Sequence, residues 1–136
     1  MALLRLLPPF GVVFAAACAS VTTLDGQRLA MASPEFRAYV EFVFRDQNRV
    51  ATELALALDG PGLSADAYAA LESAELDLLH ACAGLNVIAA ERRDGRRGGP
   101  FVGAEAARRA PECERAAGAA EAAMVSVRQQ QPARFR

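Results

Sequence analysis

The chain has 136 residues and a formal net charge of −1 at pH 7, and its fifteen basic residues are all arginine. A general nucleic-acid-binding domain is expected to be strongly basic, so this charge balance argues against that class of function. The length is sufficient for one small domain with one modest hydrophobic core.

The first seventeen residues have the pattern of a secretory signal peptide. Residues 1–5 carry one positive charge, at Arg5, and residues 6–17 carry none. This uncharged run is shorter than the roughly 20 apolar residues that a membrane-spanning helix needs. A basic start followed by a short apolar stretch is typical of an export signal, and Ala15 and Ala17 provide the small residues of an ordinary cleavage site.

The end of this segment, AAAC at residues 15–18, resembles the lipobox of bacterial lipoproteins. The resemblance covers residues 1–18 only. It implies that Cys18 is lipidated and becomes the mature N-terminus, so that the protein is anchored to the membrane by a lipid. In that family an aspartate after the cysteine favours the inner membrane, so Ala19 implies the periplasmic face of the outer membrane. The alternative is ordinary cleavage, which gives a soluble periplasmic or secreted protein.

The cysteine count is consistent with export. Three cysteines are an odd number for an exported protein, but a lipid on Cys18 leaves two, Cys82 and Cys113. Exported compartments permit disulfides, whereas the cytosol generally does not. We therefore predict a disulfide between Cys82 and Cys113. The alternative is a pair of free, buried thiols that pack as small apolar side chains.

Residues 18–32 show no regular spacing of apolar residues and no alternation typical of a strand. The dipeptide Asp25-Gly26 within them is a typical turn sequence. We predict that this segment is a flexible tether between the lipid on Cys18 and the folded domain.

The first predicted helix begins after Ser33. Ser33 is a suitable N-cap, and Pro34 is favoured at the first helical position. Apolar residues then recur at steps of three and four as far as residue 58, which predicts an amphipathic helix. The sequence DGPG at 59–62 is expected to end this helix, because glycine adopts the conformation of a helix C-cap and proline prevents continuation.

A second helix is predicted from the N-cap Ser64 to about Ala90, since apolar residues keep a helical spacing over this length. The sequence RRDGRRGGPFVG at 92–103 is rich in turn-forming residues and is predicted to be a loop. The apolar face of this helix is predicted to consist of Leu71, Leu78, Leu79, Cys82, Leu85 and Ile88.

A third helix is predicted from about Ala104 to Gln129. Pro111 lies within this span and either kinks the helix or marks its true beginning. Residues 130–136 are predicted to be a disordered tail. Helices joined by short loops pack antiparallel, so the predicted fold class is all-α, a small up-down-up three-helix bundle over residues 33–129.

The predicted helix pairing supports the disulfide. The second loop centres near Gly98 and Gly99, and the midpoint between Cys82 and Cys113 falls next to it. The two cysteines should therefore lie at nearly the same level on adjacent helices. A disulfide needs Cα atoms within about 7 Å of each other, and closely packed helices with small side chains can provide that separation.

The sequence offers no catalytic constellation. His80 is the only histidine, and although Asp77 precedes it by three residues, a di-iron bundle needs a second carboxylate–histidine pair. No serine lies in a G-x-S-x-G motif, and the glycine-rich segment 92–103 lacks the lysine and hydroxyl of a phosphate-binding loop. We therefore predict no catalytic residue, no metal and no cofactor. Asn86 either forms a buried hydrogen bond or faces solvent.

The most notable surface feature is a cluster of four arginines, Arg92, Arg93, Arg96 and Arg97, with an acidic residue among them. Guanidinium groups bind carboxylates and phosphates through paired hydrogen bonds. The cluster is therefore a candidate contact for an envelope protein, an anionic glycan or lipid head groups. The alternative is a solvated loop without a partner.

Together these observations predict an exported, lipid-anchored module of the cell envelope that has an interaction or structural role and no catalytic activity. The alternative is an enzyme or a small-ligand carrier with a pocket in the helical bundle. The two differ in structure. An interaction module needs an exposed charged or apolar patch, whereas an enzyme or carrier needs a concave site on which several polar side chains converge.

Overall fold

The computed structural model describes residues 19–96 and 100–130, apart from the side chains of residues 100–102. The predicted signal peptide, Cys18, Arg97 and residues 131–136 of the predicted tail lie outside the described residues. Within them the chain is mostly helical, as predicted, but it has four helices and a small antiparallel sheet. The elements are β1 (Ser20–Thr22), β2 (Arg28–Ala30), α1 (Pro34–Leu58), α2 (Ala65–Arg93), α3 (Pro100–Arg108) and α4 (Ala110–Gln130).

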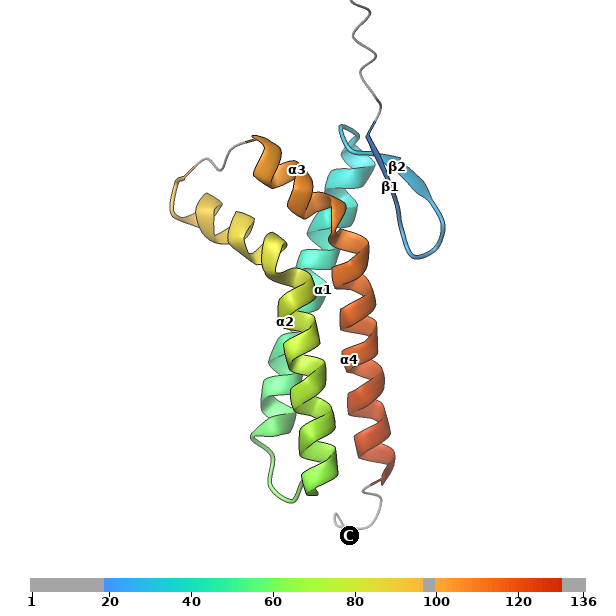
Figure 1. Cartoon of the computed structure of the whole chain (residues 1–136), viewed down its shortest axis with the longest axis vertical. Coiled ribbons are helices and arrows are strands. Elements are labelled where there is room, and N and C mark those ends of the chain that lie inside the picture. Colours follow the sequence, from blue (N-terminus) through green and yellow to red (C-terminus); the bar gives the residue numbers. More distant parts are fainter. Residues whose placement is uncertain (1–18, 97–99, 131–136) are drawn as a thin grey trace, which may run out of the picture.

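The three long helices α1, α2 and α4 lie side by side, and each contacts the other two (Figure 1). The C-terminal part of α2 bends away from α4, and the short helix α3 leads back to the start of α4. The hairpin of β1 and β2 lies beside the N-terminal end of α1, and β2 contacts that helix.

The predicted flexible tether is wrong for the described part of residues 18–32. β1 and β2 pair antiparallel, with Val21 opposite Leu29, and the Met31 N–H donates to the carbonyl of Ala19 at 2.9 Å. The described part of this segment is therefore folded, beginning at Ala19. Val21 and Thr23 are the buried side chains of this segment. Two alternating buried positions are too few to produce a visible strand pattern in the sequence.

The predicted caps of the first two helices are confirmed. The Ser33 hydroxyl accepts a hydrogen bond from the Phe36 N–H at 3.1 Å, and Pro34 opens α1. The Ser64 hydroxyl accepts from the Ala67 N–H at 3.2 Å. Each bond satisfies one of the N–H groups that have no partner within the helix. Helix α1 ends at Leu58, directly before the DGPG sequence.

The predicted loop at 92–103 is shorter than expected at both ends. Helix α2 runs to Arg93 and stops at Gly95, whose φ of 70° suits glycine. The N–H of Arg96 donates to the carbonyl of Glu91 at 2.8 Å, the bonding pattern of a Schellman cap. At the other end Pro100 begins α3, in agreement with the preference of proline for a first helical position.

The predicted third helix is in fact two helices, α3 and α4. Pro111 lacks an N–H, so it cannot donate to the carbonyl of Ala107, and a continuous helix would lose that bond. The N–H groups of Glu112 and Cys113 instead both donate to the carbonyl of Arg109, at 3.0 and 3.1 Å. Pro111 therefore lies in the first turn of α4 and marks its beginning.

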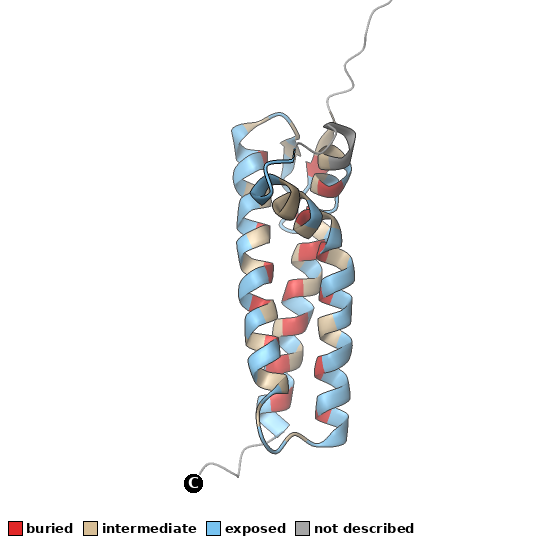
Figure 2. Ribbon diagram, turned by 90° about the vertical axis from the view of Figure 1, so that its left-hand side faces the viewer, coloured by how far each residue is buried: buried red, intermediate tan, exposed pale blue. Residues whose placement is uncertain are grey.

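The core lies between α1, α2 and α4, where buried residues face inward (Figure 2). Leu79, predicted to lie on the apolar face of α2, is 50% exposed, whereas its neighbour Leu78 is buried. The interior face of α4 consists largely of small residues. The main core residues are Val43, Val50, Leu54, Leu71, Leu78, Cys82, Cys113, Ala117, Ala120 and Met124.

The predicted disulfide is confirmed. Cys82 of α2 and Cys113 of α4 are bonded, with 4.7 Å between their Cα atoms, and neither side chain is accessible to solvent. The small side chains of Ala117 and Ala120 continue the same face of α4. They permit α2 and α4 to approach closely below the bond.

We predict that reduction of this bond with dithiothreitol lowers the free energy of unfolding by about 3–4 kcal/mol. The cysteines are 31 residues apart, and opening a loop of this length restores the corresponding chain entropy to the unfolded state. Urea unfolding with and without the reductant measures the change. A variant with both Cys82→Ala and Cys113→Ala is the control, since its stability should not respond to the reductant. Equal responses of the two proteins would contradict the prediction.

A second prediction concerns the contact between α2 and α3. A Cβ at Gly84 would lie 3.0 Å from the Cβ of Ala106, whereas a Cβ at Gly118 of α4 would meet nothing within 4 Å. Gly118→Ala should therefore stabilise by about 0.5–1 kcal/mol through helix propensity. Gly84→Ala should gain less, and Gly84→Leu should destabilise by about 1–3 kcal/mol through overpacking. Urea unfolding measures all three, and an equal gain from both alanine variants would contradict the close contact.

Candidate functional site

A groove between α1, α2 and α3 is the principal concave feature of the described residues, with a volume of about 840 Å³. We call it the α1–α2–α3 groove. It lies where the end of α2 has bent away from α4 (Figure 1). The described α3 residues that line it are Gly103, Ala104 and Ala107, which are all small. Apolar side chains that line the groove are Phe36, Val40 and Phe44 of α1, Leu85 and Ile88 of α2, and Ala104 of α3.

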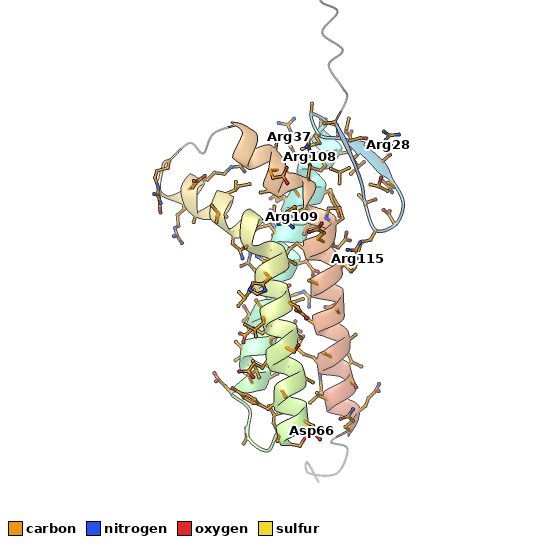
Figure 3. The ribbon with its side chains drawn as sticks, viewed as in Figure 1. Arg28, Arg37, Asp66, Arg108, Arg109 and Arg115 are labelled. Atoms are coloured by element: carbon orange, nitrogen blue, oxygen red, sulfur yellow. A yellow bond between two sulfur atoms is a disulfide. The ribbon has the colours of Figure 1, made fainter. Side chains whose placement is uncertain are left out.

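Three charged side chains also line this groove. Arg37 comes from α1 and Arg92 from α2, and neither forms an ion pair within the described residues. Glu41 of α1 is already bonded to Arg45. Figure 3 places Arg37 at the hairpin end of the molecule, near Arg108. The groove therefore combines an apolar interior with two arginines that are available to an anion.

A hydrogen bond between two amide side chains, one of them buried, joins α1 to α2 close to the groove. The Gln47 Nε2 donates to the Asn86 Oδ1 at 2.8 Å, and Gln47 is only 3% exposed. Gln47 lies one turn after Phe44, and Asn86 follows Leu85, both of which line the groove. Of the two alternatives for Asn86, the hydrogen-bonded one is therefore correct. Sequence analysis missed Gln47, because a glutamine between apolar residues gives no signal of its own.

Two polar contacts join α1 to α4. The Tyr39 hydroxyl donates to Glu114 Oε2 at 2.6 Å. Burial, together with this bond to a carboxylate, raises the pKa of Tyr39 well above its usual range. Further along, Arg49 bonds to Asp46 and Glu53 within α1 and to Glu121 of α4. These contacts fix α1, one wall of the groove, against α4.

The predicted arginine cluster is divided by the structure. Arg92 lies in the last turn of α2 and lines the groove. The guanidinium groups of Arg93 and Arg96 lie 3.5 and 2.9 Å from Asp94 and are largely exposed. Arg97 lies outside the described residues. Only Arg92 of this cluster is therefore part of the groove.

Part of the α2 surface that faces away from the core is apolar. Leu76, Leu79 and Val87 are each about half exposed. Their spacing of three and eight residues places them on one side of the helix. This side of α2 therefore carries three partly exposed apolar side chains.

The carboxylate–histidine pair noted in the sequence, Asp77 and His80, does not line the groove. His80 and Asp77 are both exposed on α2. Within the described ranges, no three His, Cys, Asp or Glu side chains are grouped so that they could hold a metal ion. The charged groups of the groove are two arginines and one carboxylate, and among the described residues no serine, cysteine or histidine lines it.

No protein-family model, curated protein or solved structure matches this chain. In the part of the chain that the structure describes, none of the helices has both the length and the apolar character required to cross a membrane. Function is therefore inferred from the groove, the disulfide and the sequence.

We predict that Asn86→Ala lowers the free energy of unfolding by about 1–3 kcal/mol, because it leaves the buried amide of Gln47 without its partner. A double variant with Gln47→Leu and Asn86→Leu should recover most of this loss, since both polar groups are then removed together. Urea unfolding measures both variants. Equal stability of the wild type and Asn86→Ala would show that the hydrogen bond contributes nothing.

Proposed function

We propose that this chain is an exported, lipid-anchored protein of the bacterial cell envelope that acts by binding, without catalysis. The observation that carries the proposal is the fully buried disulfide between Cys82 and Cys113. Disulfides form and persist in oxidising compartments and are rare in the cytosol. The export pattern of residues 1–17 supports the same compartment independently.

The proposed lipid on Cys18 is supported by the cysteine count. With Cys82 and Cys113 bonded to each other, Cys18 is the one cysteine that remains, and it stands at the lipobox position. Ala19 directly after it favours the outer membrane over the inner membrane, by resemblance to the lipoprotein sorting pattern. Because Ala19 is already hydrogen-bonded to Met31, a lipid on Cys18 would hold the hairpin end of the domain close to the membrane surface.

The proposed absence of catalysis is supported by the chemistry of the groove. Its lining is mainly apolar, and its polar side chains do not form an acid–base or nucleophile pair. The half-exposed Leu76, Leu79 and Val87 support an interaction role. A small-ligand carrier is the second candidate, because a groove of about 840 Å³ lies within the size range of small-molecule sites.

We also infer that α1, α2 and α4 correspond to the up-down-up three-helix bundle expected from the sequence, with α3 as a short addition. Their mutual contacts and shared core support this assignment. The exposed arginines Arg93 and Arg96, with Arg92 and Arg97, remain proposed contacts for an anionic glycan, a lipid head group or an envelope protein.

We predict that Cys18→Ala moves the protein from the membrane fraction to the soluble fraction and abolishes metabolic labelling with a radioactive fatty acid. The thiol of Cys18 is the proposed attachment point, so no lipid can be added without it. Cys82→Ala is the matched control, because it removes a cysteine of the disulfide and should leave the labelling intact. A wild-type protein that is never labelled would replace lipid anchoring with ordinary secretion.

A further inference from the structure

The α1–α2–α3 groove is closed on three sides by helices of one domain. Its volume of about 840 Å³ is smaller than a partner helix would need. A helix with side chains is about 10–12 Å in diameter, so ten residues occupy roughly 1,200–1,700 Å³. The groove can therefore hold a single extended chain, whereas a helix of another protein would lie partly outside it.

The interior of the groove is suited to a hydrocarbon chain. Val40, Phe44 and Ile88 line it and are only partly buried, although they lie next to fully buried core residues. Covering apolar side chains of this kind gains about 25 cal/mol per Å² of apolar surface removed from water. An apolar ligand in the groove would cover the parts of these side chains that remain exposed among the described residues.

The charges of the groove select an anion for the polar end of that ligand. Arg37 and Arg92 come from two different walls and form no ion pair within the described residues. The third charged group, the carboxylate of Glu41, accepts a hydrogen bond from Arg45, so its charge is already paired. Guanidinium groups bind a carboxylate through strong, paired hydrogen bonds.

We infer that this groove binds a long-chain carboxylate, with its hydrocarbon chain between α1, α2 and α3 and its carboxylate against Arg37 and Arg92. The inference goes beyond the proposed envelope role and does not depend on a lipid at Cys18. It accounts for the apolar groove and for the two arginines that line it. Neither feature is explained by the disulfide or by the export pattern.

The test uses the purified full chain with Cys18→Ala, which removes the proposed lipid-attachment site, and titrates it with oleate in a calorimeter. Oleate should bind at one site. Oleyl alcohol, which has the same chain without the charge, and acetate, which has the charge without the chain, should each bind at least tenfold more weakly. Replacing Arg37 and Arg92 with glutamine should weaken oleate binding at least tenfold. The matched control Arg128→Gln, at the opposite end of α4, should leave the affinity unchanged.

A second pair of variants tests the location. Gly103 lines the groove, and a Cβ there would meet nothing within 4 Å, so Gly103→Leu should fill the groove without disturbing the packing. Gly118→Leu adds the same side chain to equally open space on α4, outside the groove. Gly103→Leu should weaken oleate binding at least tenfold, and Gly118→Leu should not change it. Far-ultraviolet circular dichroism, which measures helix content, checks that both variants are folded.

Several results would overturn the inference. They are the absence of oleate binding, equal binding of oleate and oleyl alcohol, and equal effects of Gly103→Leu and Gly118→Leu. A different outcome would assign the groove to a protein partner. In that case the Cys18→Ala protein would not bind oleate, and a partner that cross-links to it would no longer cross-link to the Gly103→Leu variant. None of these experiments measures lipid labelling or location in the cell. A negative result would therefore overturn the oleate site and would not affect the envelope proposal, which the labelling of Cys18 tests.

Discussion

The close contact between α2 and α4, fixed by the disulfide between Cys82 and Cys113, is the constraint on which the rest of the structure depends. Cys113 lies only two residues after Pro111, so the bond clamps α2 near the very beginning of α4. The part of α2 beyond Cys82 has no α4 beside it and bends away (Figure 1). Helix α3 covers that part instead, and the groove lies between them and α1. Pro111 and the disulfide thus both lie near the point where α2 leaves α4.

Polar contacts between the long helices fix the position of α1, which forms one wall of the groove. Gln47 and Asn86 join α1 to α2, and Tyr39 and Glu114 join α1 to α4. Because the pKa of Tyr39 is raised by burial and by the bond to Glu114, its hydroxyl stays protonated and keeps donating well into the alkaline range. Two walls of the groove, α1 and α2, are therefore held by specific hydrogen bonds in addition to apolar contacts.

Features with a local chemical cause could be predicted from the sequence. The caps at Ser33 and Ser64 depend on one side chain each, and the disulfide follows from the pairing of two long helices. The hairpin could not be predicted, because it depends on two buried side chains, Val21 and Thr23, and on contact with α1. The groove could not be predicted either, since it arises from the direction that α2 takes after Cys82, which sequence periodicity does not encode.

The alanine-rich face of α4 limits the hydrophobic stabilisation of the domain, and the disulfide adds stability of another kind. Alanine buries little apolar surface, so Ala110, Ala117 and Ala120 contribute less hydrophobic free energy than leucines would. The same small side chains let α4 approach α2 closely enough for the two cysteines to bond. The bond then stabilises the fold by restricting the unfolded chain, which partly offsets the small burial. A domain of this design gains part of its stability only where the disulfide can form, which agrees with its proposed location outside the cytosol.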